Sequence, residues 1–168
     1  SIRRRQRQMC IRDRPNVKAV LITHMHSDHM ADLPDAHLQS WIQGRTAPLK
    51  VYGPEGINLV TKGFELAYSP DYQYRNEHHG DDMLPMSIVG FNAIQIIDNQ
   101  LIQNDTPGLE ILPFVVDHHP VNSSFGFKVS YKGRTVVISG DTIHDGSVQK
   151  YSKDVDLLVH SAISIDIC

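Results

Sequence analysis

The sequence predicts an α/β protein whose sheets and helices form an αβ/βα sandwich. In the first half of the chain, short β-branched apolar runs alternate with segments of helical apolar spacing. In the second half, short strands separated by turn residues dominate. The 168 residues, 40% of them hydrophobic, suffice for the core of one domain. A doubly wound parallel sheet fits less well, because it requires strands and helices to alternate throughout.

The first half opens with a strand. VKAVLIT (17–23) is a short, mostly apolar, β-branched run of the kind found in buried strands. Apolar spacing and turn residues then predict a helix over residues 31–45 and a strand over residues 47–56. A second helix is predicted over residues 56–69, and a polar loop over residues 71–85.

The second half consists mainly of strands. They are predicted over residues 94–102, 109–117, 124–133, 134–141 and 154–162. The third and fourth of these read as a hairpin that turns at Lys132-Gly133. A short helical stretch is predicted around residues 148–151, before the last strand.

The N-terminal segment differs in composition from the rest. Residues 1–14, SIRRRQRQMCIRDR, hold six arginines and show no apolar periodicity, which predicts a disordered basic arm. The run also resembles a translated sequencing adaptor, so a non-native origin is the alternative. Residues 15–168 are then a partial domain of acidic net charge, which disfavours non-specific nucleic-acid binding without excluding an RNA substrate.

The lengths of the apolar runs and the positions of the two cysteines exclude several classes of protein. No run approaches the roughly 20 apolar residues that span a bilayer, and the N-terminus lacks the apolar core of a signal peptide. We therefore expect a cytoplasmic protein without a membrane partner. Cys10 and Cys168 allow neither a disulfide framework nor a CxxC site, so nitrogen and oxygen must hold any metal.

Histidine clustering is the main functional signal. HMHSDH (24–29) follows directly on the first predicted strand and contains three imidazoles and one carboxylate. Alternate side chains in an extended segment point the same way, so His24 and His26 are expected to bind one metal. Asp28 and His29, past the bend, are expected to face a second metal.

The sequence THMHSDH (23–29) resembles the HxHxDH signature of the metallo-β-lactamase superfamily. That family has a later histidine and then a strand ending in Gly-Asp, which VDHHPVNSSFGFKV and RTVVISGDT resemble. The resemblance implies a metallo-β-lactamase-type sandwich, incomplete in this chain. It also implies that His118 completes the first metal site and that Asp141 bridges the two metals. His119 is the alternative to His118 if the loop register shifts by one residue.

Further segments resemble one group within the superfamily. DLPDAHLQSW, PLKVYGPEG, YRNEHHG and SFGFKV are similar to ribonuclease Z, the tRNA 3′-end endonuclease, and to its arylsulfatase-like and phosphodiesterase-like relatives. A His-Glu-Ala motif supplies a catalytic histidine in that group, and LVHSA matches it except at Ser161. The resemblance implies that His160 protonates the leaving group without the family's orienting carboxylate. It also implies an N-terminal strand pair before Pro15 and a further metal-binding histidine beyond Cys168.

The implied activity is metal-dependent hydrolysis with two zinc ions. Manganese or iron would accept the same nitrogen and oxygen donors. His26 separates the chain from the diiron redox branch, where glutamate is expected. Asp28 would orient or deprotonate the attacking water.

Three functions remain open from the sequence. The first is a phosphodiesterase or endoribonuclease acting on RNA such as a tRNA precursor, and a protruding arm or basic groove for the tRNA body would favour it. This first function includes the cleavage of a smaller phosphodiester. The second is hydrolysis of a small ester, either an aryl sulfate or a lactone. The third is an inactive metal-binding fragment. A homodimer is also expected, and Asp117 could orient a ligand imidazole. His37 and His144 are predicted to lie at the surface or around the ligands.

Overall fold

The structure is a computed structural model that describes residues 16–144 and 146–162, and these form two compact units. Within this range, the first unit comprises residues 16–22 and 27–94. The second unit comprises residues 23–26 and 95–162. The chain therefore enters the second unit for four residues and returns to the first. The arm predicted over residues 1–14 lies outside the described residues.

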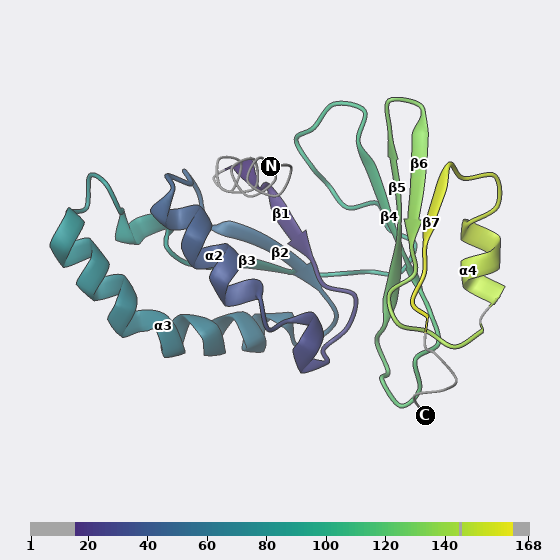
Figure 1. Cartoon of the computed structure of the whole chain (residues 1–168), viewed down its shortest axis with the longest axis horizontal. Helices are drawn as coiled ribbons and strands as arrows, with labels where there is room; N and C mark the ends of the chain where they lie inside the picture. Colours follow the sequence, from purple (N-terminus) through teal and green to yellow (C-terminus); the bar gives the residue numbers. More distant parts are fainter. Residues whose placement is uncertain (1–15, 145, 163–168) are drawn as a thin grey trace, which may run out of the picture. The chain divides into compact units, whose positions relative to one another are not determined.

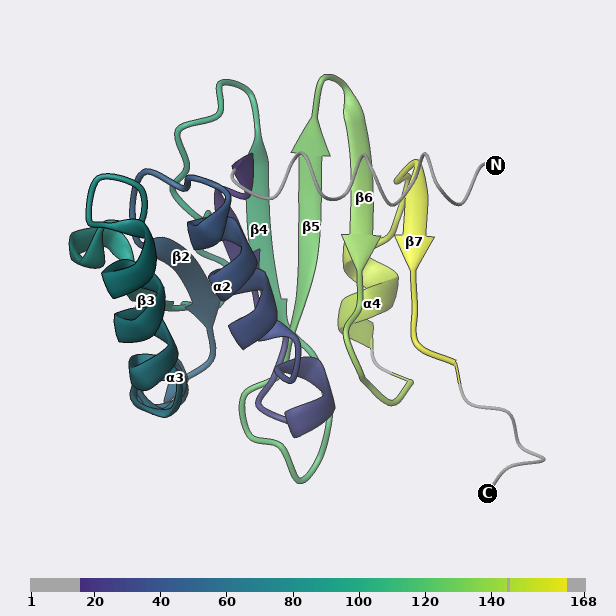
Figure 2. The ribbon, with the colours of Figure 1, turned by 60° about the vertical axis from the view of Figure 1, so that its left-hand side comes forward.

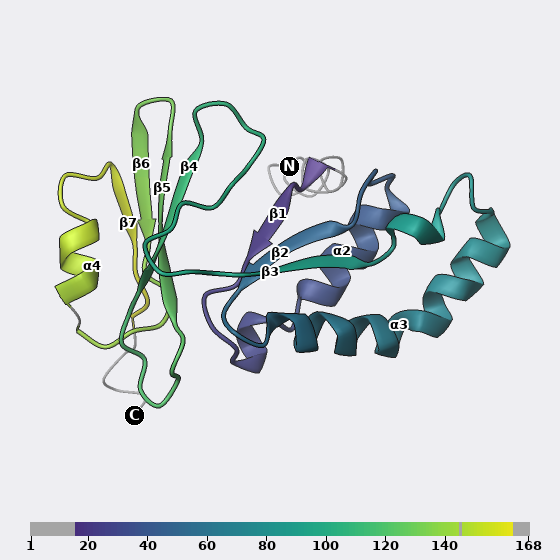
Figure 3. The ribbon, with the colours of Figure 1, turned by 180° about the vertical axis from the view of Figure 1, so that it is seen from behind.

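The first unit is a three-stranded sheet in the order β1-β2-β3, with β1 and β2 parallel. Helices α2 and α3 lie along the same face of this sheet (Figures 1 and 3). The elements in chain order are β1 (Ala19–Leu21), the 3-10 turn η2 (Ser27–His29), α2 (Leu33–Ile42), β2 (Leu49–Gly53), α3 (Ile57–His79), the 3-10 turn η3 (Met86–Ile88) and β3 (Phe91–Gln95). Trp41 packs in the apolar core beneath these helices with Leu38, Tyr72 and Leu84.

Helix α3 is longer than the sequence predicts. The loop expected over residues 71–85 is wrong for its first nine residues, because α3 continues to His79. Pro70 lies inside the helix and cannot donate a backbone hydrogen bond to Leu66. The Ser69 hydroxyl donates to that Leu66 carbonyl instead, at 2.9 Å. Tyr72, which is 4% exposed, anchors the following turn in the core.

His37 is buried, so the first of its two predicted positions, the surface, is wrong. Its ring is fully excluded from solvent and stacks on Phe91 at a centroid distance of 3.9 Å. Its Nε2 is hydrogen-bonded to the carbonyl of Val89, and Tyr72 Oη lies 3.4 Å from its Nδ1. Burial, and then the charge of Arg45, lower the pKa of His37 to about 4. His37 is therefore a neutral core residue at pH 7.

Arg45 joins the end of α2 to the segment before β3. The residue is only 6% exposed. One guanidinium nitrogen donates to Ser40 Oγ at 2.9 Å, and the other donates to the carbonyls of Ile88 at 2.9 Å and Val89 at 3.3 Å. Burial lowers the pKa of Arg45 to about 10, so the guanidinium keeps its charge at neutral pH.

The second unit is a four-stranded sheet in the order β4-β5-β6-β7. Its elements are β4 (Glu110–Val115), β5 (Phe125–Tyr131), β6 (Arg134–Ile138), α4 (Gly146–Tyr151) and β7 (Leu157–Val159). Strands β4 to β6 are antiparallel, whereas β6 and β7 are parallel. Helix α4 covers one face of this sheet (Figures 1 and 2), where Val148 packs against Phe114, Val116 and Val137.

Most of the predicted second-half elements are confirmed. The β5-β6 hairpin turns at Lys132 and Gly133, whose φ angles of 50° and 73° are those of a two-residue type I′ turn. The strand predicted over 94–102 is wrong beyond Gln95, since the chain turns there and Asp98 Oδ1 accepts a hydrogen bond from the Val115 amide at 3.0 Å. The α/β class is confirmed, because each unit combines a sheet with helices. None of the helices in the described ranges is long and apolar enough to cross a membrane.

Candidate metal centre

Three imidazoles converge in the second unit. His24, His26 and His118 each offer one ring nitrogen, and these three nitrogens lie within 4.8 Å of one another. His24 Nε2 lies 3.0 Å from His26 Nδ1, and His118 Nε2 lies 3.4 Å from the same atom. The rings stand nearly perpendicular to one another, at interplanar angles of 80°, 85° and 87°. The structure thus brings together residues that are 92 positions apart in the chain.

The spacing of these nitrogens suits a metal ion. Tetrahedral coordination with metal–nitrogen bonds of about 2.0–2.1 Å places two ligand nitrogens about 3.3–3.4 Å apart. The two nitrogen–nitrogen distances at His26, 3.0 and 3.4 Å, lie close to this value. Three imidazoles are also a common donor set for zinc. The residues present therefore fit a metal ion held by His24, His26 and His118.

The segment 23–26 is held in the second unit by backbone contacts. The Phe125 amide donates to the Thr23 carbonyl at 2.9 Å. Gly140 packs against the same threonine, with a φ of +66° that L side chains rarely adopt. A Cβ at Gly140 would lie 2.9 Å from the Phe125 carbonyl oxygen and 3.1 Å from Thr23 Cβ. Glycine is therefore required directly before Asp141.

Thr23 is a site residue that the sequence analysis missed. Its Oγ1 lies 3.0 Å from Nδ1 of His24, which is completely buried. A proton on Nδ1 that is donated to Thr23 makes Nε2 the nitrogen whose lone pair can bind a cation. The available signal was the position of Thr23 directly before the first histidine of HMHSDH.

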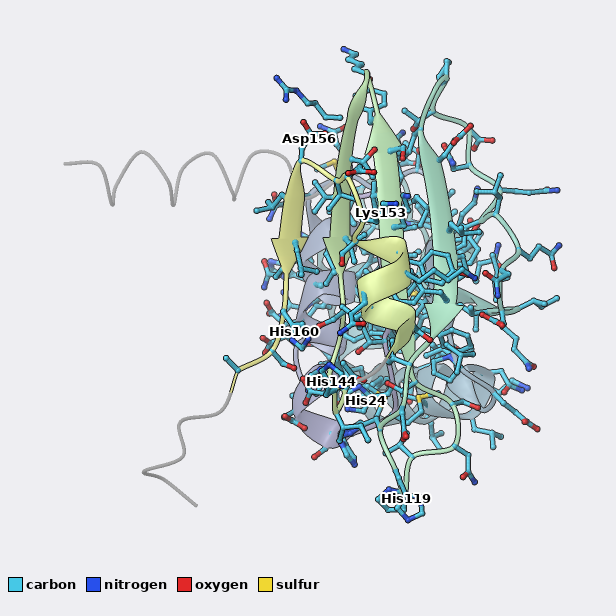
Figure 4. The ribbon with its side chains drawn as sticks, turned by 90° about the vertical axis from the view of Figure 1, so that its right-hand side faces the viewer. His24, His119, His144, Lys153, Asp156 and His160 are labelled. Carbon is cyan, nitrogen blue, oxygen red and sulfur yellow. The ribbon has the colours of Figure 1, made fainter. Side chains whose placement is uncertain are left out.

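The loop that carries His118 is tied to the segment after Asp141. The carbonyl of Asp117 accepts hydrogen bonds from the Ile143 amide at 3.0 Å and the Thr142 hydroxyl at 2.8 Å. The Asp117 carboxylate accepts one from the His119 amide at 3.1 Å. Figure 4 shows His119 at the tip of this loop, away from His24. Whether the Asp117 carboxylate orients an imidazole stays a prediction.

Asp141 lies next to the imidazole cluster. A carboxylate oxygen of Asp141 and a ring nitrogen of His24 lie within 4.8 Å of each other. The Ser124 hydroxyl, which is buried, donates to the Asp141 carbonyl at 3.5 Å. Asp141 is thus placed where a carboxylate could reach a metal bound near His24.

Asp28 and His29 belong to the first unit, in η2. Asp28 Oδ2 lies 3.4 Å from His29 Nε2. The side chain of Asp28 is 79% exposed and that of His29 is 29% exposed. Both residues follow His26 within three positions, and their role as ligands of a second metal stays a prediction.

His160 follows β7 directly. Because β6 and β7 are parallel, His160 and Asp141 both come after the carboxyl ends of neighbouring strands. Figure 4 shows His160 at the same end of the sheet as His24. His160 Nδ1 donates to the Ser161 carbonyl at 2.7 Å, which leaves Nε2 for other partners. His144 is exposed, as predicted, and contacts Gln149.

Comparison with known proteins gives one family match and a set of similar relatives. The family model described as Metallo-beta-lactamase superfamily matches residues 11–164. Ribonuclease Z of Mycobacterium marinum is 34% identical over 154 residues, which are 90% of this chain and 53% of that protein. A putative ribonuclease Z of Mycobacterium tuberculosis is 33% identical over 151 residues, 88% of this chain and 65% of that protein. The chain thus spans about half to two thirds of the length of these relatives.

Solved structures show the same similarity. Human tRNase Z, short form, aligns with a TM-score of 0.62 at 25% identity, covering 92% of this chain and 61% of the human chain. The metallo-beta-lactamase fold protein YhfI from Bacillus subtilis aligns with a TM-score of 0.55 at 20% identity, covering 84% and 47%. At that identity, the second alignment is evidence for the fold alone.

Proposed function

The chain belongs to the metallo-β-lactamase superfamily, and from this membership we propose that it is the metal-binding part of a phosphodiester hydrolase that resembles ribonuclease Z. The family and the fold type expected from HxHxDH are confirmed by the family match over residues 11–164. The observation that carries the proposal is the convergence of His24, His26 and His118, which come from segments far apart in the chain.

We propose that the site holds two zinc ions, with manganese or iron as chemically acceptable substitutes. His24, His26 and His118 would hold one ion, whereas Asp28 and His29 would contribute to the other. Asp141 would bridge the two. Metal ions in such a site lower the pKa of bound water and stabilise charge on the attacking and leaving oxygens.

Two residues of this chain have proposed proton-transfer roles. Asp28 would accept a proton from the attacking water, since its carboxylate is largely exposed and follows His26 by two positions. His160 would donate a proton from Nε2 to the leaving oxygen. The Ser161 carbonyl, which accepts the Nδ1 proton, would orient the ring in place of the family's glutamate.

The names of the relatives favour a tRNA precursor as the substrate, and we propose a cytoplasmic location with it. A smaller phosphodiester is the second candidate. The observation that favours it is the β5-β6 hairpin, which closes in two residues and so adds no protruding arm at that turn. None of the relatives named above is a sulfatase or lactonase, so these two substrates are not proposed.

The proposal is tested with the full chain supplied with zinc. We expect two metals per chain by elemental analysis, cleavage of a 3′-extended tRNA precursor, and turnover of bis(p-nitrophenyl) phosphate. Both activities should disappear after chelation and return when zinc is added. Turnover of the small ester without RNA cleavage would select the smaller substrate. Bound metal without either activity would show that the chain is an inactive metal-binding fragment.

A homodimer is proposed from the exposed face of α3. Leu59, Leu66 and Tyr74 are 70%, 77% and 69% exposed, and their spacing of seven and eight residues aligns them on one side of the helix. An apolar stripe of this kind is buried when two copies of the helix pack together. We expect Leu66→Glu to shift the chain from dimer to monomer in light scattering. Met83→Glu should not, because Met83 lies outside α3, although it is 70% exposed. A wild-type monomer would contradict this proposal.

A further inference from the structure

Three polar side chains form a buried cluster in the core of the first unit. His37 on α2 is hydrogen-bonded to Tyr72 on α3, and Arg45, which follows α2, donates to the His37 backbone carbonyl. The exposed fractions of His37, Arg45 and Tyr72 are 0%, 6% and 4%. The proposed hydrolase function uses none of these three groups, although one of them can change its charge in mild acid.

The hydrogen bonds fix which ring nitrogen of His37 carries the proton. The Val89 carbonyl can only accept, so the Nε2 that is hydrogen-bonded to it must be protonated. Nδ1 of the neutral ring is then an acceptor, and Tyr72 Oη lies 3.4 Å from it. Burial raises the pKa of Tyr72 to about 12, so its hydroxyl keeps a proton to donate. The neutral ring therefore has a partner at each nitrogen.

A second proton on the ring would disturb this arrangement. Tyr72 would have to turn its hydroxyl from donor to acceptor, and the charged ring would lie beside the guanidinium of Arg45. Arg45 donates to the Val89 carbonyl at 3.3 Å, so both side chains use the same acceptor. Two like charges without a carboxylate between them are costly to bury.

The other elements around the ring do not offset that charge. Phe91 of β3 stacks on the ring, and the carbonyls of Val89 and Gly90 are the groups that favour protonation of His37. The titratable groups of α3 that surround Tyr72 act on Tyr72 itself; they are Glu65, Tyr68 and Asp71. Glu65 Oε1 accepts the Phe91 amide at 2.6 Å. In the described part of the chain, no carboxylate is hydrogen-bonded to the His37 ring.

We propose that His37 is an acid-sensitive switch of the first unit, whose protonation breaks the packing of α2 against α3 and the segment before β3. The direction follows from proton binding. The unfolded chain takes up this proton around the ordinary pKa of 6.5, whereas burial lowers the pKa in the folded unit to about 4. The stabilisation by the neutral ring is therefore complete above about pH 6.5 and is lost as the pH falls towards about 4.

The test is urea unfolding of the full chain at pH 7 and pH 5, with a chelator present so that metal binding does not contribute. Trp41, the single tryptophan, packs with Tyr72 in this core, so its fluorescence reports on the first unit. His37→Gln keeps an amide donor for the Val89 carbonyl but does not titrate. From pH 7 to pH 5, we expect the unfolding equilibrium constant of the wild type to rise about twentyfold more than that of His37→Gln.

The matched control is His78→Gln, which removes an exposed imidazole near the end of α3. Its pH dependence should follow that of the wild type. Equal pH dependence of the wild type and His37→Gln would overturn the proposal. If His37→Gln does not fold, an NMR titration of the wild-type ring decides: we expect His37 to stay neutral in the folded chain at pH 5, and titration near pH 6.5 would overturn the proposal.

Discussion

Replacing His118 by alanine is expected to abolish metal binding at the three-imidazole site and to lower phosphodiester turnover by at least about a thousandfold. The expected loss corresponds to about 4 kcal/mol of transition-state stabilisation, which is what a catalytic metal typically supplies. His118 contributes Nε2, at 3.4 Å from His26 Nδ1, and its removal leaves two of the three converging nitrogens. The measurements are metal content and the rate of bis(p-nitrophenyl) phosphate hydrolysis.

The matched control is the adjacent histidine. His119→Ala removes an imidazole from the same loop, but His119 is exposed and points away from His24 (Figure 4). It should therefore bind metal and turn over substrate nearly as the wild type does. A large loss in His119→Ala, with little effect of His118→Ala, would show that the loop binds metal in the other register.

Replacing Arg45 by methionine is expected to lower the free energy of unfolding of the first unit by about 3–5 kcal/mol. The guanidinium is buried, and its removal takes the donor from the partly buried carbonyl of Ile88 and from the buried Ser40 hydroxyl. Methionine retains most of the apolar volume of the arginine side chain, so the change in the free energy of unfolding measures mainly the lost hydrogen bonds. Trp41 is the single tryptophan and is buried in the same unit, so its fluorescence during urea unfolding measures this effect.

Arg75→Met is the control for this substitution. Arg75 forms an ion pair with Asp71 one turn earlier on α3, at 2.7 Å, and both side chains are more than a third exposed. Such pairs contribute only about 0.3–0.5 kcal/mol. Similar destabilisation by the two arginine substitutions would mean that Arg45 does not join α2 to the segment before β3.

The first strand and the HMHSDH loop that follows it are predicted well, because the sequence signals for both are local. A β-branched run leads directly into HMHSDH, and the observed β1 ends at Leu21, three positions before His24. His118 is different, since two adjacent histidines in a polar loop do not by themselves show which of them binds a metal. Its selection depended on resemblance to a family, and its place beside His26 depends on contacts 92 residues apart.

The wrong predictions for residues 71–79 and for His37 have physical causes that cannot be read from patterns in a single sequence. Residues 71–79 are mostly polar, but tertiary contacts support the helix there: Tyr72 is buried, and Asn76 Nδ2 donates to the Leu84 carbonyl at 2.8 Å. The break expected at Pro70 is offset by a hydroxyl from Ser69. His37 reads as polar in the sequence, yet tertiary contacts with Phe91 and Val89 bury it as a neutral ring.

Residues 23–26 belong to the second unit although the residues on either side belong to the first, and this affects the order in which contacts form during folding. The β4-β5-β6 hairpins connect neighbours in sequence and can form early, whereas the imidazole cluster closes a loop of 92 residues. A separately produced piece covering residues 95–168 would retain one of the three imidazoles. Metal affinity therefore measures whether the chain has formed this long-range contact, and a time-resolved metal probe would follow that step of folding.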